Sequence, residues 1–116
     1  MIPKFRAYAK EANKTYEITE IDFGDEQLKT ELGDWWSFGE VEIMQSTGLK
    51  DKNGVEIFEG DIGWDDHQEV HGQVIFENGA FKYEWDNISE DLFEATDDIE
   101  IVGNIYENSE LLEGTE

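Results

Sequence analysis

Residues 45–62, with the sequence QSTGLKDKNGVEIFEGDI, decide the fold that this chain is expected to adopt. Two turn signals, Asn-Gly at 53–54 and Glu-Gly-Asp at 59–61, lie between short apolar pairs, and the stretch has no helical periodicity. Asn-Gly favours a tight turn because both of its residues accept a positive φ. Short strands separated by glycine-rich turns indicate a mainly β fold with short helical segments, built as a small barrel or roll.

The clearest hairpin is expected over residues 73–85, around a second Asn-Gly turn at 78–79. A two-residue turn fixes the register of the two strands. It pairs Phe76 with Phe81 and Val74 with Tyr83. In the same register Gly72 falls opposite Trp85, where the missing side chain would leave room for the indole.

Weaker patterns place the remaining elements. Strands are expected near residues 4–8, 40–43 and 99–101, with a bulge near Thr19-Glu20, where the apolar phase slips. A short helical turn is expected within 24–33 from the spacing of Leu28 and Leu32. Two further helical turns are expected, one capped by Ser89 with Leu92 and Phe93 facing inward, and one capped by Asn108.

The size and composition predict a single domain over residues 1–116. An aromatic content of 13% supports a packed core, because disordered chains are poor in aromatic residues. The chain has no cysteine, so disulfides and thiolate metal sites are excluded. We expect a soluble cytoplasmic protein, since no signal peptide or long apolar run is visible.

The formal net charge is −22, and it is unevenly distributed. Residues 1–52 hold seven basic and 11 acidic residues, whereas residues 53–116 hold one basic residue, Lys82, and 19 acidic ones. Direct nucleic-acid binding is not expected, because it depends on Lys and Arg at the phosphates. The acidic surface either keeps the protein dispersed, which we favour, or imitates DNA and occupies a basic site on a nucleic-acid-binding protein.

The two histidines of the chain, His67 and His71, have the spacing of the zinc motif H-E-x-x-H, but the order here is H-Q-E-V-H. Residues four apart on a strand share a face, so a weak metal site is geometrically allowed. An exposed loop with two solvated imidazoles is the simpler interpretation. We therefore assign no metal site and no cofactor.

No other pattern indicates catalysis. The serines fall in no G-x-S-x-G motif, and no glycine loop has the spacing that cradles a phosphate. With 30 acidic residues, a pair of carboxylates carries no information about acid–base chemistry. The sequence gives no reason to assign catalytic residues, and we expect a protein that is not an enzyme.

The adjacent residues Trp35 and Trp36 are the most interesting side chains on a candidate surface. If this segment is extended, one indole enters the core and the other faces outward. An exposed Trp beside Phe38 would suit a protein contact, since Trp is enriched at binding hot spots. Trp35, Trp36 and Phe38 are therefore the candidate protein interface, with burial of both indoles as the alternative. Trp64 and Trp85 follow strand patterns and are expected in the core.

Several of these segments together resemble the YopX-like family of phage and prophage proteins. The resemblance spans nearly the whole chain, and its most specific part is the T-G-L-x-D-x-N-G…E-G-D block. The segments are residues 4–7, 44–54, 57–62 and 103–108. In many members the E-G-D-I segment continues into an apolar strand, which Gly63 is expected to interrupt here.

The resemblance implies an SH3-like barrel in the C-terminal portion and frequent assembly into oligomers. On this basis residues 1–43 form an N-terminal β-rich subregion, residues 44–110 the barrel, and residues 111–116 a frayed tail. The expected function is that of a non-enzymatic phage or prophage accessory protein acting through protein–protein contacts, as a homo-oligomer. The alternative is an acidic, DNA-mimicking inhibitor whose partner is a host or phage protein with a basic surface. The resemblance implies a location in the bacterial host cytoplasm, and no membrane contact is expected.

Overall fold

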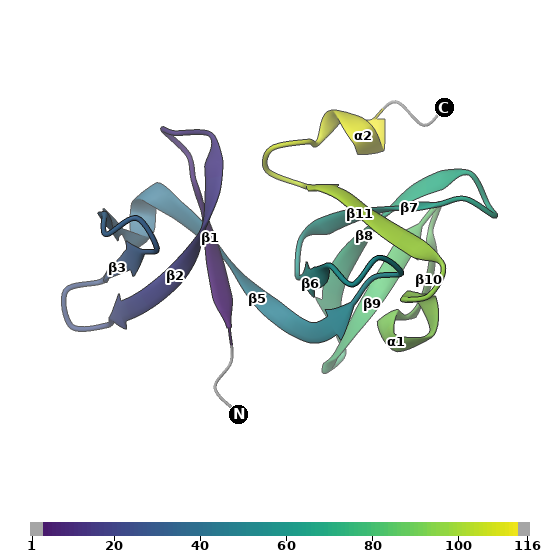
Figure 1. The fold of residues 1–116 in the computed structure, drawn as a ribbon, viewed down its shortest axis with the longest axis horizontal. Coiled ribbons are helices and arrows are strands. Elements are labelled where there is room, and N and C mark those ends of the chain that lie inside the picture. Colours follow the sequence, from purple (N-terminus) through teal and green to yellow (C-terminus); the bar gives the residue numbers. More distant parts are fainter. Residues whose placement is uncertain (1–3, 114–116) are drawn as a thin grey trace. The chain divides into compact units, whose positions relative to one another are not determined.

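The computed structural model describes residues 4–113 and shows a mainly β protein with short helical segments (Figure 1). The chain divides into two compact units at the Ser46–Thr47 bond, which we call unit 1 and unit 2. Within the described residues the α-helices are single turns of four residues each. No helix in this part of the chain has the length and apolar character needed to cross a bilayer.

Unit 1 is built around an antiparallel sheet of short strands. Its elements are β1 (Phe5–Ala9), β2 (Lys14–Asp22), β3 (Gln27–Thr30), β4 (Trp35–Ser37), the 3-10 turn η1 (Phe38–Glu40) and the first part of β5 (Val41–Lys50). The strands lie in the order β4-β3-β2-β1-β5, with β6 (Glu56–Phe58) beside the last part of β5. The core of unit 1 consists of the buried residues Ala7, Ala9, Leu28 and Val41.

Unit 2 contains a second antiparallel sheet. After β6 come β7 (Asp61–Asp65), β8 (Val70–Glu77), β9 (Ala80–Trp85), β10 (Ile88–Asp91), α1 (Leu92–Ala95), β11 (Ile99–Asn104) and α2 (Glu110–Glu113). The strand order is β10-β9-β8-β7-β11, so β10 and β11 are its two edges (Figure 1). Closure into a barrel was therefore a wrong expectation, since no ladder joins β10 to β11 among the described residues.

The predicted hairpin and bulge are confirmed. β8 and β9 pair Phe76 with Phe81 and Val74 with Tyr83, the register that the Asn-Gly turn requires. The turn residue Asn78 has a φ of 54°. In β2 the ladder to β3 shifts between Ile18 and Glu20, which is the expected bulge.

Two expectations about glycines were wrong. Gly63 does not interrupt the strand, because it lies inside β7 and pairs with Gly72 of β8. The space above Gly72 is filled by the ring of Tyr83 rather than by the indole of Trp85. Paired strand residues share a face, so the two neighbouring glycines together open a slot wide enough for an aromatic ring.

The predictions of helical turns were less accurate. Residues 27–30 form β3, not a helical turn, because alternate residues Leu28 and Thr30 are buried in strand fashion. Asp91, not Ser89, caps α1: its side chain accepts a hydrogen bond from the Phe93 N–H. Leu92 faces inward as expected, but Phe93 is exposed.

The C-terminal segment also differs from the prediction. The side chain of Asn108 does not cap α2 but turns back, accepting a hydrogen bond from the Asn104 N–H at 3.1 Å. Residues 111–113, expected to be frayed, belong to α2. The remainder of the predicted tail, residues 114–116, lies outside the described residues.

Candidate functional site

The candidate interface residues lie at the edge of the sheet in unit 1. β4 is the edge strand, and Trp35 on it is 44% exposed. Trp36 faces the other way, pairs with Leu28 of β3 and packs against the core of unit 1. Phe38 also packs against that core. The structure therefore places one of the three rings, that of Trp35, mainly at the surface.

Two further apolar side chains are exposed in the turns that flank β3. Phe23, between β2 and β3, is 76% exposed and contacts Phe38 edge to face, with ring centroids 6.1 Å apart. Leu32, between β3 and β4, is also strongly exposed. Sequence reasoning missed both, although each lies directly beside a glycine in a turn, where an apolar side chain has little to pack against. We call Phe23, Leu32 and Trp35 the Trp35 edge.

The central motif of the sequence has a structural role at Asp51. Its carboxylate is buried and accepts three backbone hydrogen bonds, from the N–H groups of Asn53, Val55 and Ile101 at 2.8–2.9 Å. The Asp51 carbonyl also accepts from the Gly54 N–H. One side chain thus shapes the Asn-Gly turn and ties it to β11, so the motif encodes a turn rather than a reactive group.

Other buried polar side chains near the motif act in the same way. Asp61 accepts a hydrogen bond from the Phe58 N–H at 2.7 Å, which closes the turn between β6 and β7. Asn104 accepts from the N–H groups of Tyr106 and Glu107 after β11. These buried groups hold backbone turns in place, as buried polar groups must be satisfied.

The two histidines are held in different environments. His67 lies in the exposed turn before β8, and its backbone N–H donates to the Asp65 carboxylate. Because this turn lies outside β8, His67 does not share a strand face with His71. His71 lies on β8 opposite Trp64, and their ring centroids are 4.8 Å apart. Trp64 is partly buried and does not belong to the core cluster of unit 2, contrary to the prediction, whereas Trp85 packs against that core. Among the described residues no group of three His, Cys, Asp or Glu is arranged to hold a metal ion.

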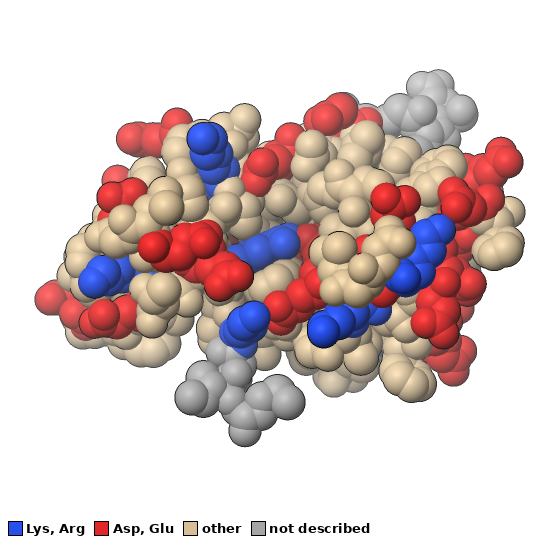
Figure 2. Space-filling view, viewed as in Figure 1, with Lys and Arg blue, Asp and Glu red and all other residues tan. Residues whose placement is uncertain are grey.

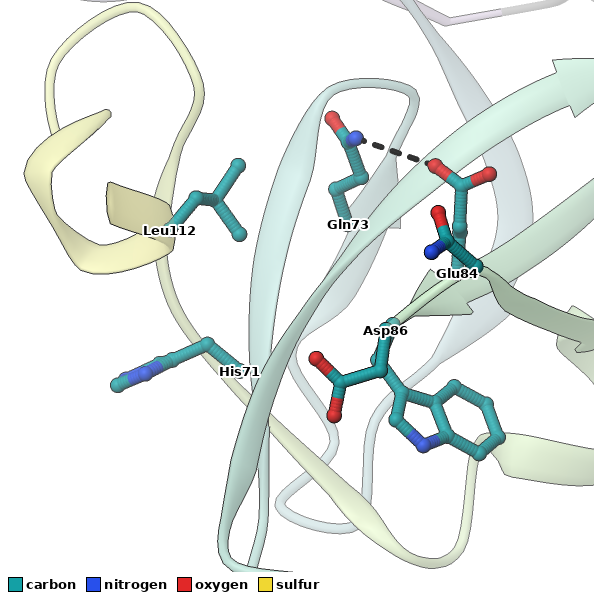
Figure 3. Close-up of a pocket in the computed structure, with 7 residues that line it drawn as sticks. His71, Gln73, Glu84, Asp86 and Leu112 are labelled. Atoms are coloured by element: carbon teal, nitrogen blue, oxygen red, sulfur yellow. Dashed lines mark hydrogen bonds between the residues drawn. The ribbon is translucent and has the colours of Figure 1, made fainter. Parts of the chain in front are cut away.

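A polar cavity of about 360 Å³ lies on unit 2 (Figure 3). Leu112 of α2 points toward the β8–β9 hairpin, where the Gln73 amide donates to the Glu84 carboxylate at 3.3 Å (Figure 3). The lining has two carboxylates and no hydroxyl or thiol nucleophile, so no base–nucleophile pair is assembled there. The lining residues are His71, Gln73, Glu84, Trp85, Asp86, Asn87 and Leu112.

A second concentration of carboxylates surrounds Glu90 of β10. Burial raises the pKa of Glu90, and the nearby charges of Glu94, Asp98 and Asp65 raise this pKa further. Lys52 forms an ion pair with Asp66 at 3.0 Å and also interacts electrostatically with Asp65. We call Asp65, Glu90, Glu94 and Asp98 the Glu90 cluster. Figure 2 shows acidic side chains over both units, with basic ones scattered among them.

The hydroxyl of Tyr83 lies beside the Glu90 cluster. Burial, and then the charges of Asp65 and Glu90, raise the pKa of Tyr83 well above its usual value. A contact with the backbone of Gly72 lowers the pKa of Tyr83 and so opposes this shift. Among the described residues no group meets the geometry of a hydrogen bond to the Tyr83 hydroxyl oxygen, which is therefore buried without a partner. A buried hydroxyl without a partner calls for a physical explanation.

Comparison with solved structures shows relatives with the same fold over nearly the full chain. Protein EF1440 from Enterococcus faecalis is 32% identical, with a TM-score of 0.78, over 97% of this chain and 99% of that one. The protein yopX from Bacillus subtilis is 18% identical, with a TM-score of 0.63, over 97% and 98% of the two chains. A search of curated proteins found no match.

The family models give a match over the described length of the chain. The model described as YopX protein matches residues 4–113, which include the turn residues Asp51 and Asp61. The expected resemblance is thereby confirmed, and the yopX protein from Bacillus subtilis has the same fold. This chain belongs to the YopX family.

Proposed function

We propose that this protein is a phage or prophage accessory protein that works in the host cytoplasm without catalysis, through contacts with other proteins. Its most distinctive polar residues support this, because Asp51 and Asp61 are occupied in holding turns. The matching family model is described as YopX protein, and this description names no catalytic activity. The observation that carries the proposal is the exposed ring of Trp35 on an edge strand, beside a neighbour that is packed inward.

The Trp35 edge has the character of a contact surface. Aromatic side chains supply much of the binding energy at protein interfaces, and Trp is the most enriched among them. Two large aromatic rings, those of Phe23 and Trp35, are exposed within residues 23–35 of unit 1. An edge strand also offers backbone groups on which another chain can pair.

A second copy of the same chain is the partner that we propose for the Trp35 edge. Unit 1 has five basic and ten acidic residues, a net charge of −5, whereas unit 2 has three basic and 20 acidic residues, a net charge of −17. Repulsion between copies is therefore weaker at unit 1. A homo-oligomer built through unit 1 leaves the more acidic unit out of the contact surface.

Sedimentation velocity over a range of protein concentrations tests this proposal. The double variant Phe23→Ser and Trp35→Ser is expected to shift the protein toward the monomer, while wild type associates. Phe76→Ser is the matched control, because Phe76 is a ring of similar exposure, 53%, in unit 2. A monomeric wild type at all concentrations, or equal effects of both sets of substitutions, would overturn the proposal.

We also propose that unit 2 is a partly open, SH3-like barrel. The strand order β10-β9-β8-β7-β11 supports this, because the last strand returns to pair with the first strand of the sheet. The single helical turn α1 between β10 and β11 fits the same architecture. An experimental structure in which the second sheet is flat and uncurled would contradict it.

Imitation of DNA is the second candidate function, and the charge of unit 2 favours it. A net charge of −17 on about 70 residues gives this unit a field of the same sign as a phosphate backbone. Competition between this protein and duplex DNA for a bacterial nucleoid protein tests the idea, with fluorescence anisotropy as the readout. Displacement at an equimolar ratio supports imitation, and the lack of any displacement at low salt excludes it.

A further inference from the structure

In unit 2, carboxylates from four separate segments of the chain lie close to one another. Glu90 lies on the edge strand β10, Glu94 on α1, Asp98 just before the other edge strand β11, and Asp65 at the end of β7. The last three all act electrostatically on Glu90. No Lys or Arg is among the charges that act on Glu90. Lys52 interacts electrostatically with Asp65 but is ion-paired with Asp66, so the cluster keeps an excess of negative charge.

Glu90 points to the inner side of its strand. It pairs with Tyr83 in the β9–β10 ladder, and paired residues of an antiparallel ladder share a face. Tyr83 is 1% exposed and its hydroxyl has no hydrogen-bond partner. Asp65 and Glu90 both act on this hydroxyl, so a buried, unsatisfied polar atom faces the same group of carboxylates.

The arrangement does not suit a metal ion. Tight metal coordination needs several oxygens at about 2.0–2.6 Å from one point, and the described residues contain no group of three acidic or histidine side chains placed in that way. More widely spaced carboxylates suit a cation that carries several donors, as the ammonium group of Lys and the guanidinium group of Arg do.

The surroundings add an apolar contact and a free strand edge. Phe93, between Glu90 and Glu94 in the sequence, is 70% exposed, and Ile88 at the start of β10 is also exposed. β10 is the last strand of its sheet, and a strand edge can accept a further strand. Lys and Arg have aliphatic stems that can cover an aromatic ring while their charged ends reach a carboxylate.

We propose that the edge formed by β10 and α1 binds an extended, Lys- or Arg-bearing segment of another protein, with its cationic group among the carboxylates of the Glu90 cluster. The segment pairs with β10, and the aliphatic stem packs on Phe93. A second copy of this chain does not fit, because inward and outward carboxylates on an edge strand repel another acidic strand. The proposal rests on the proposed role in protein contacts, and names a second surface and its partner.

The binding of a fluorescent peptide in which Lys alternates with Thr tests this proposal by anisotropy at physiological ionic strength. The triple variant Glu90→Gln, Glu94→Gln and Asp98→Asn removes the charges but leaves Asp65, whose carboxylate holds a turn. The control variant carries Glu11→Gln, Glu20→Gln and Asp25→Asn, which are exposed positions in unit 1 with the same loss of charge.

The cluster variant is expected to lose at least about tenfold in affinity, and the control variant less than about threefold, because close charge pairs couple far more strongly than distant ones. In addition, the peptide should protect β10 amides of the full-length protein from hydrogen exchange. Equal losses in the two variants would show attraction by net charge alone, and no binding or no protection of β10 would also overturn the proposal. Thermal melting of the cluster variant checks that it is folded.

This experiment is independent of the test at the Trp35 edge. Loss of peptide binding in the cluster variant leaves self-association through unit 1 unchanged, so the two proposals can fail separately. Phe93→Ser gives a further check on the geometry. It keeps every charge, and we expect it to weaken the peptide complex without changing the dependence of binding on salt.

Discussion

Gly72 of β8 lies directly beneath the aromatic ring of Tyr83 on β9. A Cβ atom added to Gly72 would be 2.6 Å from Cζ of Tyr83 and 2.8 Å from the carbonyl oxygen of Glu84. On the neighbouring strand, a Cβ atom at Gly63 would be 3.0 Å from the Tyr83 hydroxyl oxygen. The ring crosses two strands because neither glycine has a side chain, and it forms part of the core of unit 2.

Substitution of Gly72 by Ala should therefore be strongly destabilising. The backbone oxygen of Glu84 cannot move aside as a flexible side chain can, so we expect a loss of roughly 3 kcal/mol in the free energy of unfolding. Urea denaturation measures it. Gly39→Ala is the control, since an added Cβ there meets no atom within 4 Å and its change should stay within about 0.5 kcal/mol. Similar losses in both variants would contradict the packing of Tyr83 over Gly72.

Removal of the Tyr83 hydroxyl should stabilise the protein. Its oxygen is buried without a hydrogen-bond partner, and Tyr83→Phe removes that penalty, which we expect to add about 1 kcal/mol at neutral pH. Because the pKa of Tyr83 is raised in the folded state, ionisation of its hydroxyl opposes folding. The stability of the protein with neutral Tyr83 is fully present below about pH 10 and is lost as the pH rises through the folded pKa. The variant should thus resist alkaline unfolding, which Tyr16→Phe should not change. Lower stability of Tyr83→Phe would show that the hydroxyl has a partner.

The carboxylate of Asp51 should be essential for the turn and for β11. Asp51→Asn replaces one accepting oxygen by a donor, and we expect a loss of about 2 kcal/mol. Amide hydrogen exchange should accelerate at Ile101 and Val55, whose N–H groups donate to this carboxylate. The exposed Asp25→Asn has the same charge change and should leave these amides protected. Unchanged exchange in both variants would contradict the bonding seen here.

Neutralisation of Glu90 should stabilise the protein in a pH-dependent way. The pKa of Glu90 is raised by burial and then by Glu94, Asp98 and Asp65, so its charged form opposes folding. This cost is present at pH 7 and disappears as the pH falls through the folded pKa. Glu90→Gln should raise the melting temperature at pH 7 and converge with wild type near about pH 4, close to the ordinary pKa of Glu. Glu77→Gln, on an exposed residue, is the control, and an equal gain there would point to net charge alone.

Salt should stabilise the whole chain. Crowded like charges oppose compaction, and screening shortens their range to about 8 Å at physiological ionic strength. With a net charge of −22, the melting temperature should rise between low and moderate sodium chloride. A flat response would mean that the carboxylates lie too far apart to repel one another appreciably.

Local patterns predicted local structure well. The Asn-Gly turn at 78–79 fixed the β8–β9 register, because a two-residue turn leaves no freedom in the pairing. The phase slip near Thr19 predicted the bulge in β2. The spacing of Leu28 and Leu32 wrongly predicted a helical turn. Two apolar residues four positions apart also occur when one lies in a strand and the other in an exposed turn, as here.

The candidate surfaces were less accessible to sequence reasoning. Alternation along a strand indicated that Trp35 and Trp36 would face opposite ways, but not which ring would be outside. That choice follows from Leu28, which draws Trp36 to the core of unit 1. The Glu90 cluster could not be found, because its members are up to 33 positions apart and meet through the arrangement of the sheet.

By itself the amino-acid sequence determined the β class, the tight turns, the lack of thiol chemistry and the family, because these depend on near neighbours and on composition. Tertiary structure alone decided that the Asp51 carboxylate would accept a hydrogen bond from the N–H of Ile101, 50 residues away. It likewise decided that the ring of Tyr83 would pack over two glycines. It also decided which carboxylates would crowd around Glu90. Contacts between distant strands depend on how the whole sheet is assembled, and no local pattern of residues encodes that assembly.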